Sequence, residues 1–269
     1  MRRFLVVLLA LTFGGLPAWP QSAPASQVYV FPLFIDGAAG ALRYRSTLKI
    51  RSLDAGTLQC ALTQRNTSAP FVGVDGSFYS ADVFDGGSSP PAQTQITLDR
   101  FLPFEILRTS AQSSLKTGYA SLSCPGNVET QLLISLTDAQ NNKLGETTIV
   151  PAAEGTSFQF LVDRRDGTRL GFSLANASST TGQFVLIARD RFNYEIDRAY
   201  DSIEPWSQVS RFVDELLSLP ADFAGSVELV GVTGGHNYAI GLQFTGAVFT
   251  AIPPLVRSAA LPMSSGGTQ

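Results

Sequence analysis

Four acidic residues close together in the second half of the chain could carry out acid–base chemistry. Glycoside hydrolysis uses two carboxyl groups that flank the bond to be broken. The densest acidic stretch holds Glu195, Asp197, Asp201 and Glu204. Two arginines are interleaved with these acids, so a solvated, ion-paired surface explains the stretch without any reaction. We expect this surface, and a carbohydrate-active hydrolase that uses an acidic pair is the alternative.

Other reactive side chains are few. The chain has one histidine and two cysteines, too few for metal or haem sites built from several such ligands. His236 follows two glycines, and no G-x-S-x-G motif accompanies it, so we expect a turn residue rather than a catalytic base. Asp163 and Asp166 precede a glycine in one loop and could bind calcium, although Asp-Gly is typical of hairpin turns. We predict no catalytic residue and no cofactor.

Aromatic side chains gather in two regions that lack clean strand alternation. Aromatic residues of β proteins usually fill the core, but outside alternating strands they are more often exposed, where their flat faces can bind a ligand. The candidate binding residues are Phe71, Phe78, Tyr79 and Phe84 in the first region, and Tyr194, Tyr200 and Trp206 in the second.

The first 25 residues have the pattern of a secretory signal peptide. Arg2 and Arg3 precede an apolar run, and Ala23-Pro24-Ala25 fits a cleavage site. The run is shorter than the roughly 20 apolar residues of a spanning helix, so we expect no transmembrane helix in the mature chain. Without Arg2 and Arg3 the chain carries 17 basic and 22 acidic side chains. The net charge is therefore negative, and it lacks the excess of basic side chains that proteins use to bind nucleic acid.

Cys60 and Cys124 are the only cysteines. An exported chain meets an oxidising compartment, where an even number of cysteines favours disulfide formation. Neither belongs to a C-x-x-C motif, which argues against a redox-active pair. We therefore predict a structural disulfide between them.

Short apolar or alternating runs recur between turn signals, which is typical of a β-sandwich or barrel. Several runs match in order between the two halves: 31–36 with 158–163, 48–52 with 172–176, 118–122 with 225–229, and 148–151 with 250–253. The offset falls by about twenty residues, which places an insertion near 66–95 in the first copy. We predict an all-β chain of two tandem antiparallel β-sandwich domains from an internal duplication, 26–153 and 154–257, and a disordered tail over 258–269.

One segment departs from the β pattern. Val209, Phe212, Val213, Leu216 and Leu217 have helical spacing and are followed by a proline. The spacing predicts one short amphipathic helix of about three turns in the second domain.

Over residues 27–256 the chain resembles the tandem immunoglobulin-like or fibronectin-type-III-like modules of secreted bacterial proteins, although the Cys…Trp…Cys signature of immunoglobulin domains is absent. The resemblance implies an architecture and no specific activity. We expect a secreted, periplasmic or cell-surface module without catalysis, adhesive or structural, that recognises an envelope polymer or a protein partner through loops and sheet edges. An outer-membrane barrel is a further alternative, and it would need strands of about ten residues.

Overall fold

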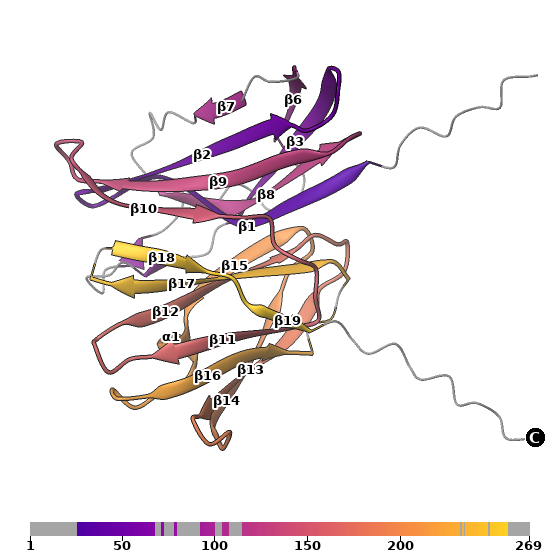
Figure 1. Cartoon of the computed structure of the whole chain (residues 1–269). Helices are drawn as coiled ribbons and strands as arrows, with labels where there is room; N and C mark the ends of the chain where they lie inside the picture. Colours follow the sequence, from indigo (N-terminus) through magenta and orange to yellow (C-terminus); the bar gives the residue numbers. More distant parts are fainter. Residues whose placement is uncertain are drawn as a thin grey trace, which may run out of the picture.

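The computed structural model describes an almost entirely β protein (Figure 1). It covers residues 26–67, 71–72, 78–79, 92–99, 104–107, 115–231, 233, 235–246 and 248–257. The predicted signal peptide, the predicted tail and most of the predicted insertion lie outside these residues. The all-β class, the antiparallel pairing and the presence of a short helix are confirmed. None of the described helical residues forms a segment long and apolar enough to cross a membrane.

The described residues of the first half form ten strands. They are β1 (Gln27–Ala39), β2 (Leu42–Ser52), β3 (Leu58–Thr67), β4 (Phe71–Val72), β5 (Phe78–Tyr79), β6 (Ala92–Leu98), β7 (Phe104–Leu107), β8 (Lys116–Cys124), β9 (Val128–Thr137) and β10 (Lys143–Ile149). Eight of them form a sheet of order β10-β9-β2-β1-β8-β3-β6, in which β7 also pairs with β2. The remaining two, β4 and β5, pair with each other.

Strand β1 folds this sheet over on itself. Its ladder with β8 shifts register between Phe31 and Phe34, and its last residues, 37–39, pair with β2 instead. A register shift of this kind bends a strand and increases its twist. Leu48 of β2 and Leu62 of β3 consequently belong to the same buried cluster. The eight-stranded sheet therefore forms the two layers of a sandwich, and β1 belongs to both layers.

The second half forms two separate sheets. Its elements are β11 (Ser157–Asp163), β12 (Arg169–Asn176), β13 (Gly182–Asp190), β14 (Glu195–Ile203), β15 (Ser207–Phe212), α1 (Val213–Leu216), β16 (Ala224–Val230), β17 (Asn237–Thr245), β18 (Val248–Ile252) and β19 (Leu255–Arg257). One sheet has the order β14-β13-β16-β11-β19, and the other has the order β15-β12-β17-β18.

The two halves repeat one strand order. The series β10-β9-β2-β7 corresponds to β18-β17-β12-β15, and β1-β8-β3-β6 corresponds to β11-β16-β13-β14. Even the bridge of Ala152 to Val30 has a counterpart in the pairing of Arg257 with Ser157. An internal duplication is expected to give this correspondence; the duplication and the domain boundary at residue 153 stay predictions.

The sheet β15-β12-β17-β18 lies between the folded first half and the sheet β14-β13-β16-β11-β19 (Figure 1). On one face Phe172 and Leu174 belong to the buried cluster of the second half. On the other, Leu242 and Phe244 belong to the buried cluster of the first half. Ser173 Oγ is buried between the layers and donates to the carbonyl oxygen of Pro32 at 2.8 Å. The two halves therefore share apolar burial, which is the largest stabilising term of folding.

The predicted three-turn helix is much shorter than its spacing suggested. Val209 and Phe212 lie in β15, and only Val213–Leu216 is helical. Along its whole length β15 pairs with β12, from Phe212 opposite Gly171 to Ser207 opposite Asn176. Sheet pairing and burial in two cores have overridden the local periodicity.

The predicted disulfide between Cys60 and Cys124 is confirmed. Ala61 pairs with Ser123, so the two cysteines lie opposite each other on the neighbouring strands β3 and β8, with their Cα atoms 4.4 Å apart. Both side chains are fully buried. The bond thus joins two strands inside the core of the first half.

Candidate functional site

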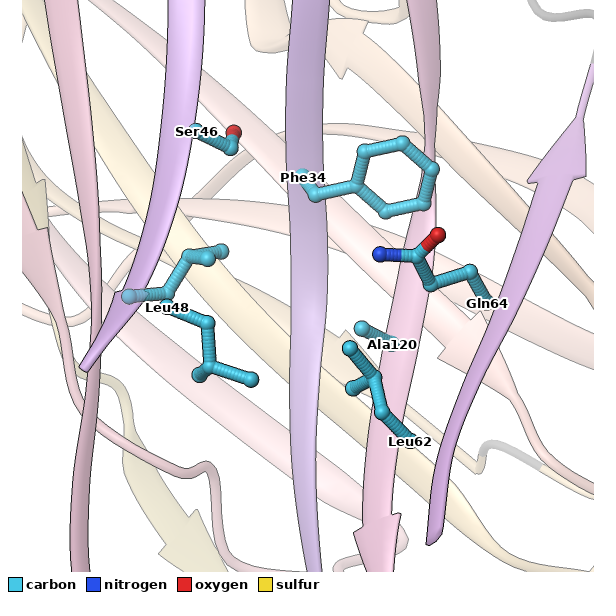
Figure 2. Close-up of a pocket in the computed structure, with 7 residues that line it drawn as sticks. Phe34, Ser46, Leu48, Leu62, Gln64 and Ala120 are labelled. Atoms are coloured by element: carbon cyan, nitrogen blue, oxygen red, sulfur yellow. The ribbon is translucent and has the colours of Figure 1, made fainter. Parts of the chain in front are cut away.

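A small cavity lies inside the first half (Figure 2). Figure 2 shows Phe34, Leu48, Leu62 and Ala120 around it, with Ser46 and Gln64 as the polar members of its lining. Its volume of about 20 Å³ is enough for about one water molecule. The hydroxyl of Ser46 is already bound to the backbone of Ile35. This cavity therefore has no room for a larger ligand.

The tip of the β13–β14 hairpin presents two aromatic rings to solvent. The carboxylate of Asp190 accepts the backbone N–H groups of Phe192 and Tyr194, each at 2.9 Å. Asn193 has φ 68°, a left-handed conformation that asparagine tolerates in tight turns. Phe192 is 65% exposed and Tyr194 is 71% exposed. The turn is fixed by its own hydrogen bonds, so both rings project from an ordered hairpin.

Strand β14 carries this exposed surface along one edge of its sheet. Among the strands that the structure describes, it pairs with β13 alone, and Tyr200 is 71% exposed. Ile196, at the register irregularity of this strand, is also exposed. Tyr194 and Tyr200 are six residues apart, which corresponds to roughly 20 Å of extended chain.

The predicted acidic group lies on the same strand, and its carboxylates have structural partners. Both oxygens of Glu195 bind Arg198, at 2.6 and 2.7 Å, and this bond lowers the pKa of Glu195. A general acid needs a raised pKa to hold a proton near neutral pH. Arg198 also reaches the hydroxyl of Tyr200 at 3.5 Å. Glu195 is therefore suited to fixing Arg198 beside the tyrosine rather than to donating a proton.

Two aspartates occupy part of the free edge of β14. Asp197 Oδ1 accepts the N–H of Arg198, and Asp201 Oδ1 accepts the N–H of Ser202, both at 2.8 Å. These N–H groups therefore do not bond to β13. Asp197 Oδ2 also accepts the N–H of Ser218 at 2.7 Å, which ties the strand to the segment after α1. Charged side chains that occupy edge amides prevent the addition of another strand.

Trp206 stands at the turn that follows β14. It has φ 53°, a conformation that costs a bulky side chain free energy and that favours glycine or asparagine. Its N–H donates to the carbonyl oxygen of Ser178, and its side chain is 43% exposed. The guanidinium carbon of Arg65, on β3 of the first half, lies 4.5 Å from the ring centroid. The tryptophan therefore lies where the two halves meet, next to an arginine that no sequence pattern connected with it.

His236, Glu154 and Tyr238 form a second group near this contact. Glu154 Oε2 lies 2.9 Å from His236 Nδ1 and accepts the hydroxyl of Tyr238 at 3.2 Å. Burial, and then the carboxylate beside it, raises the pKa of Tyr238 to about 12. The histidine bonds to an acid but to no described hydroxyl that could act as a nucleophile.

The remaining predicted residues do not join these groups. Asp163 binds Arg165 with both carboxylate oxygens, which lowers its pKa to about 2, and Asp166 has no part in that pair. Among the residues that the structure describes, no group of three or more metal-ligating acids, histidines or cysteines occurs. The backbones of Phe71, Phe78 and Tyr79 form the β4–β5 ladder, while Phe84 lies outside the described residues.

The chain was compared with known proteins at three levels. It matches no protein-family model, no curated protein and no solved structure. Tyr194, Tyr200 and Trp206 lie exposed along β14 and the turns at its two ends, and we call this surface the aromatic edge.

Proposed function

We propose that this protein is a non-catalytic binding module of the cell envelope or the exterior, and that its aromatic edge holds an extended polysaccharide. The single observation that carries the proposal is the exposure of three aromatic side chains along one edge strand and its exit turn. Exposed aromatic side chains offer flat apolar faces with a polar tip, which suits them to binding a ligand along an extended surface. Export rests on the predicted signal peptide.

The partly occupied edge favours a polymer that binds side chains over a peptide that adds a strand. Peptides bind sheet edges chiefly through backbone hydrogen bonds. The aspartates at positions 197 and 201 already occupy two of the edge N–H groups. A sugar chain needs flat apolar faces with fixed polar groups beside them. Tyr200 offers such a face, next to the Arg198–Glu195 pair.

Affinity electrophoresis of the chain in gels that contain soluble polysaccharides, neutral and acidic, tests the proposal. We expect retardation by at least one polymer, and its loss in the triple variant Tyr194→Ala, Tyr200→Ala and Trp206→Ala. Each ring should contribute about 0.5–1.5 kcal/mol, so each single variant should weaken binding roughly 2- to 13-fold.

The matched control is Leu161→Ala with Leu255→Ala, because these exposed apolar residues lie in the same sheet but away from β14. The control should be retarded like the unaltered chain. Retardation that persists in the triple variant would exclude the aromatic edge as the binding surface. The absence of retardation by every polymer tested would exclude it as well.

A further inference from the structure

A second surface lies on the first half, on the face of β3, β6 and β8 that points away from its core. Cys60 and Leu62 of β3 are buried in that core, and so are Ile96 of β6 and Leu122 of β8. Successive side chains of a strand point to opposite faces. The other face therefore carries Gln59, Ala61 and Thr63 from β3, Gln95 and Thr97 from β6, and Ser121 and Ser123 from β8, and we call it the uncharged face.

The ladders of the sheet make this face continuous. Ala61 lies opposite Gln95 on one side and opposite Ser123 on the other. Gln59 lies opposite Thr97, whose hydroxyl donates to the side-chain oxygen of Gln59 at 3.1 Å. This bond uses the oxygen of the amide and leaves its nitrogen able to donate elsewhere. Both glutamines and Thr97 are exposed, whereas Ala61 and Ser123 are half-buried between them.

The composition of the uncharged face differs from that of the other outer face of the first half. None of its seven side chains is charged. On β2, by contrast, Arg43, Arg45 and Arg51 share one face of the strand and are exposed. Amides and hydroxyls can exchange hydrogen bonds with sugar hydroxyls, and burying them costs less than burying a charge. The face therefore suits a ligand that is polar but neutral.

The uncharged face meets the aromatic edge at Trp206. The next outward position of β3 after Thr63 is Arg65, whose guanidinium carbon lies 4.5 Å from the centroid of the Trp206 ring. From Gln59 to Arg65 the strand extends over roughly 20 Å. A polymer that contacts the exposed part of Trp206 can therefore continue along β3 towards the two glutamines.

We propose that the uncharged face is the second part of the polymer site and that the bound polysaccharide is neutral. The amides of Gln59 and Gln95 bind sugar hydroxyls, and the small side chain of Ala61 leaves room for a sugar ring between them. An acidic polymer would lose hydration of its charges on this face and gain no ion pair with it. The inference deepens the proposed function and rests on it, because it extends the site beyond Trp206.

Affinity electrophoresis in gels that contain galactomannan or hydroxyethylcellulose, which are neutral, or carboxymethylcellulose, which is acidic, tests this inference. We expect retardation by a neutral polymer and weaker retardation by the acidic one. Gln59→Ala and Gln95→Ala should each weaken binding roughly 2- to 13-fold, the loss expected for one hydrogen bond. Ala61→Arg places a long cation in the middle of the face and should abolish retardation. Far-ultraviolet circular dichroism shows whether each variant is folded.

Gln131→Ala is the matched control, because Gln131 is an exposed glutamine of β9, opposite Lys49 on the other outer face of the first half. This variant should be retarded like the unaltered chain. Unchanged retardation of the folded double variant Gln59→Ala and Gln95→Ala, or retardation by carboxymethylcellulose alone, would overturn the inference. If retardation is nevertheless lost in the triple variant of the aromatic edge, the proposed function stands without the uncharged face.

Discussion

Removal of the disulfide should destabilise both halves of the chain together. The perturbation is Cys60→Ala with Cys124→Ala. The bond closes a loop with a sequence separation of 64, for which the chain-entropy relation gives about 4 kcal/mol at 25 °C. The loss in the free energy of unfolding should extend to the second half, because Leu242 and Phe244 belong to the same buried cluster as Cys60 and Leu62. Unfolding the first half alone would expose one face of the middle sheet.

Urea denaturation followed by Trp206 fluorescence and by far-ultraviolet circular dichroism measures this coupling. With a slope of about 3 kcal/mol/M, a loss of about 4 kcal/mol lowers the midpoint by about 1.3 M. Both probes should report one coincident transition before and after the substitution. Two separated transitions in the circular dichroism, of which only the earlier one moves, would refute the shared core as the source of stability.

Three further outcomes follow from local contacts. Gly241→Ala would place a Cβ atom 2.8 Å from the Phe160 ring, so the urea midpoint should fall by an amount equivalent to about 1–3 kcal/mol, and an unchanged midpoint would contradict this close packing. Asn176→Ala should cost about 2–3 kcal/mol in the same assay, because its buried amide donates to the carbonyl oxygens of Thr180 and Glu204; an unchanged urea midpoint would argue against this role. Arg165 lowers the pKa of Asp163, so this carboxylate stabilises the fold above pH 3.8 and loses that effect as the pH falls through about 2; carbon-13 NMR titration should show a midpoint near 2 that rises towards 3.8 in Arg165→Ala.

The sequence was most informative where alternation and turns repeat. The apolar runs at 31–36 and 158–163 fall in β1 and β11, which occupy corresponding places in the two strand orders. The helix was overestimated because Val209 and Phe212 satisfy a helical period only by coincidence. They face the two cores on either side of the middle sheet, which a one-dimensional pattern cannot represent.

The candidate site was only partly predictable for a similar reason. Tyr194, Tyr200 and Trp206 could be selected because they stand outside clean alternation, and all three side chains are exposed. Arg65 gave no signal, because it reads as an ordinary residue of its strand. Its contact with Trp206 forms only when the halves pack together, and the two residues lie far apart in the sequence.

The middle sheet has a consequence for the exchange of backbone amide protons with solvent. Strand β12 is hydrogen-bonded on both sides, to β15 and to β17, and nearly all of its side chains are buried. Amides in such a position exchange only when the whole structure opens. The slowest exchange rates in the chain should therefore belong to β12, and they would measure the free energy of global unfolding without any denaturant.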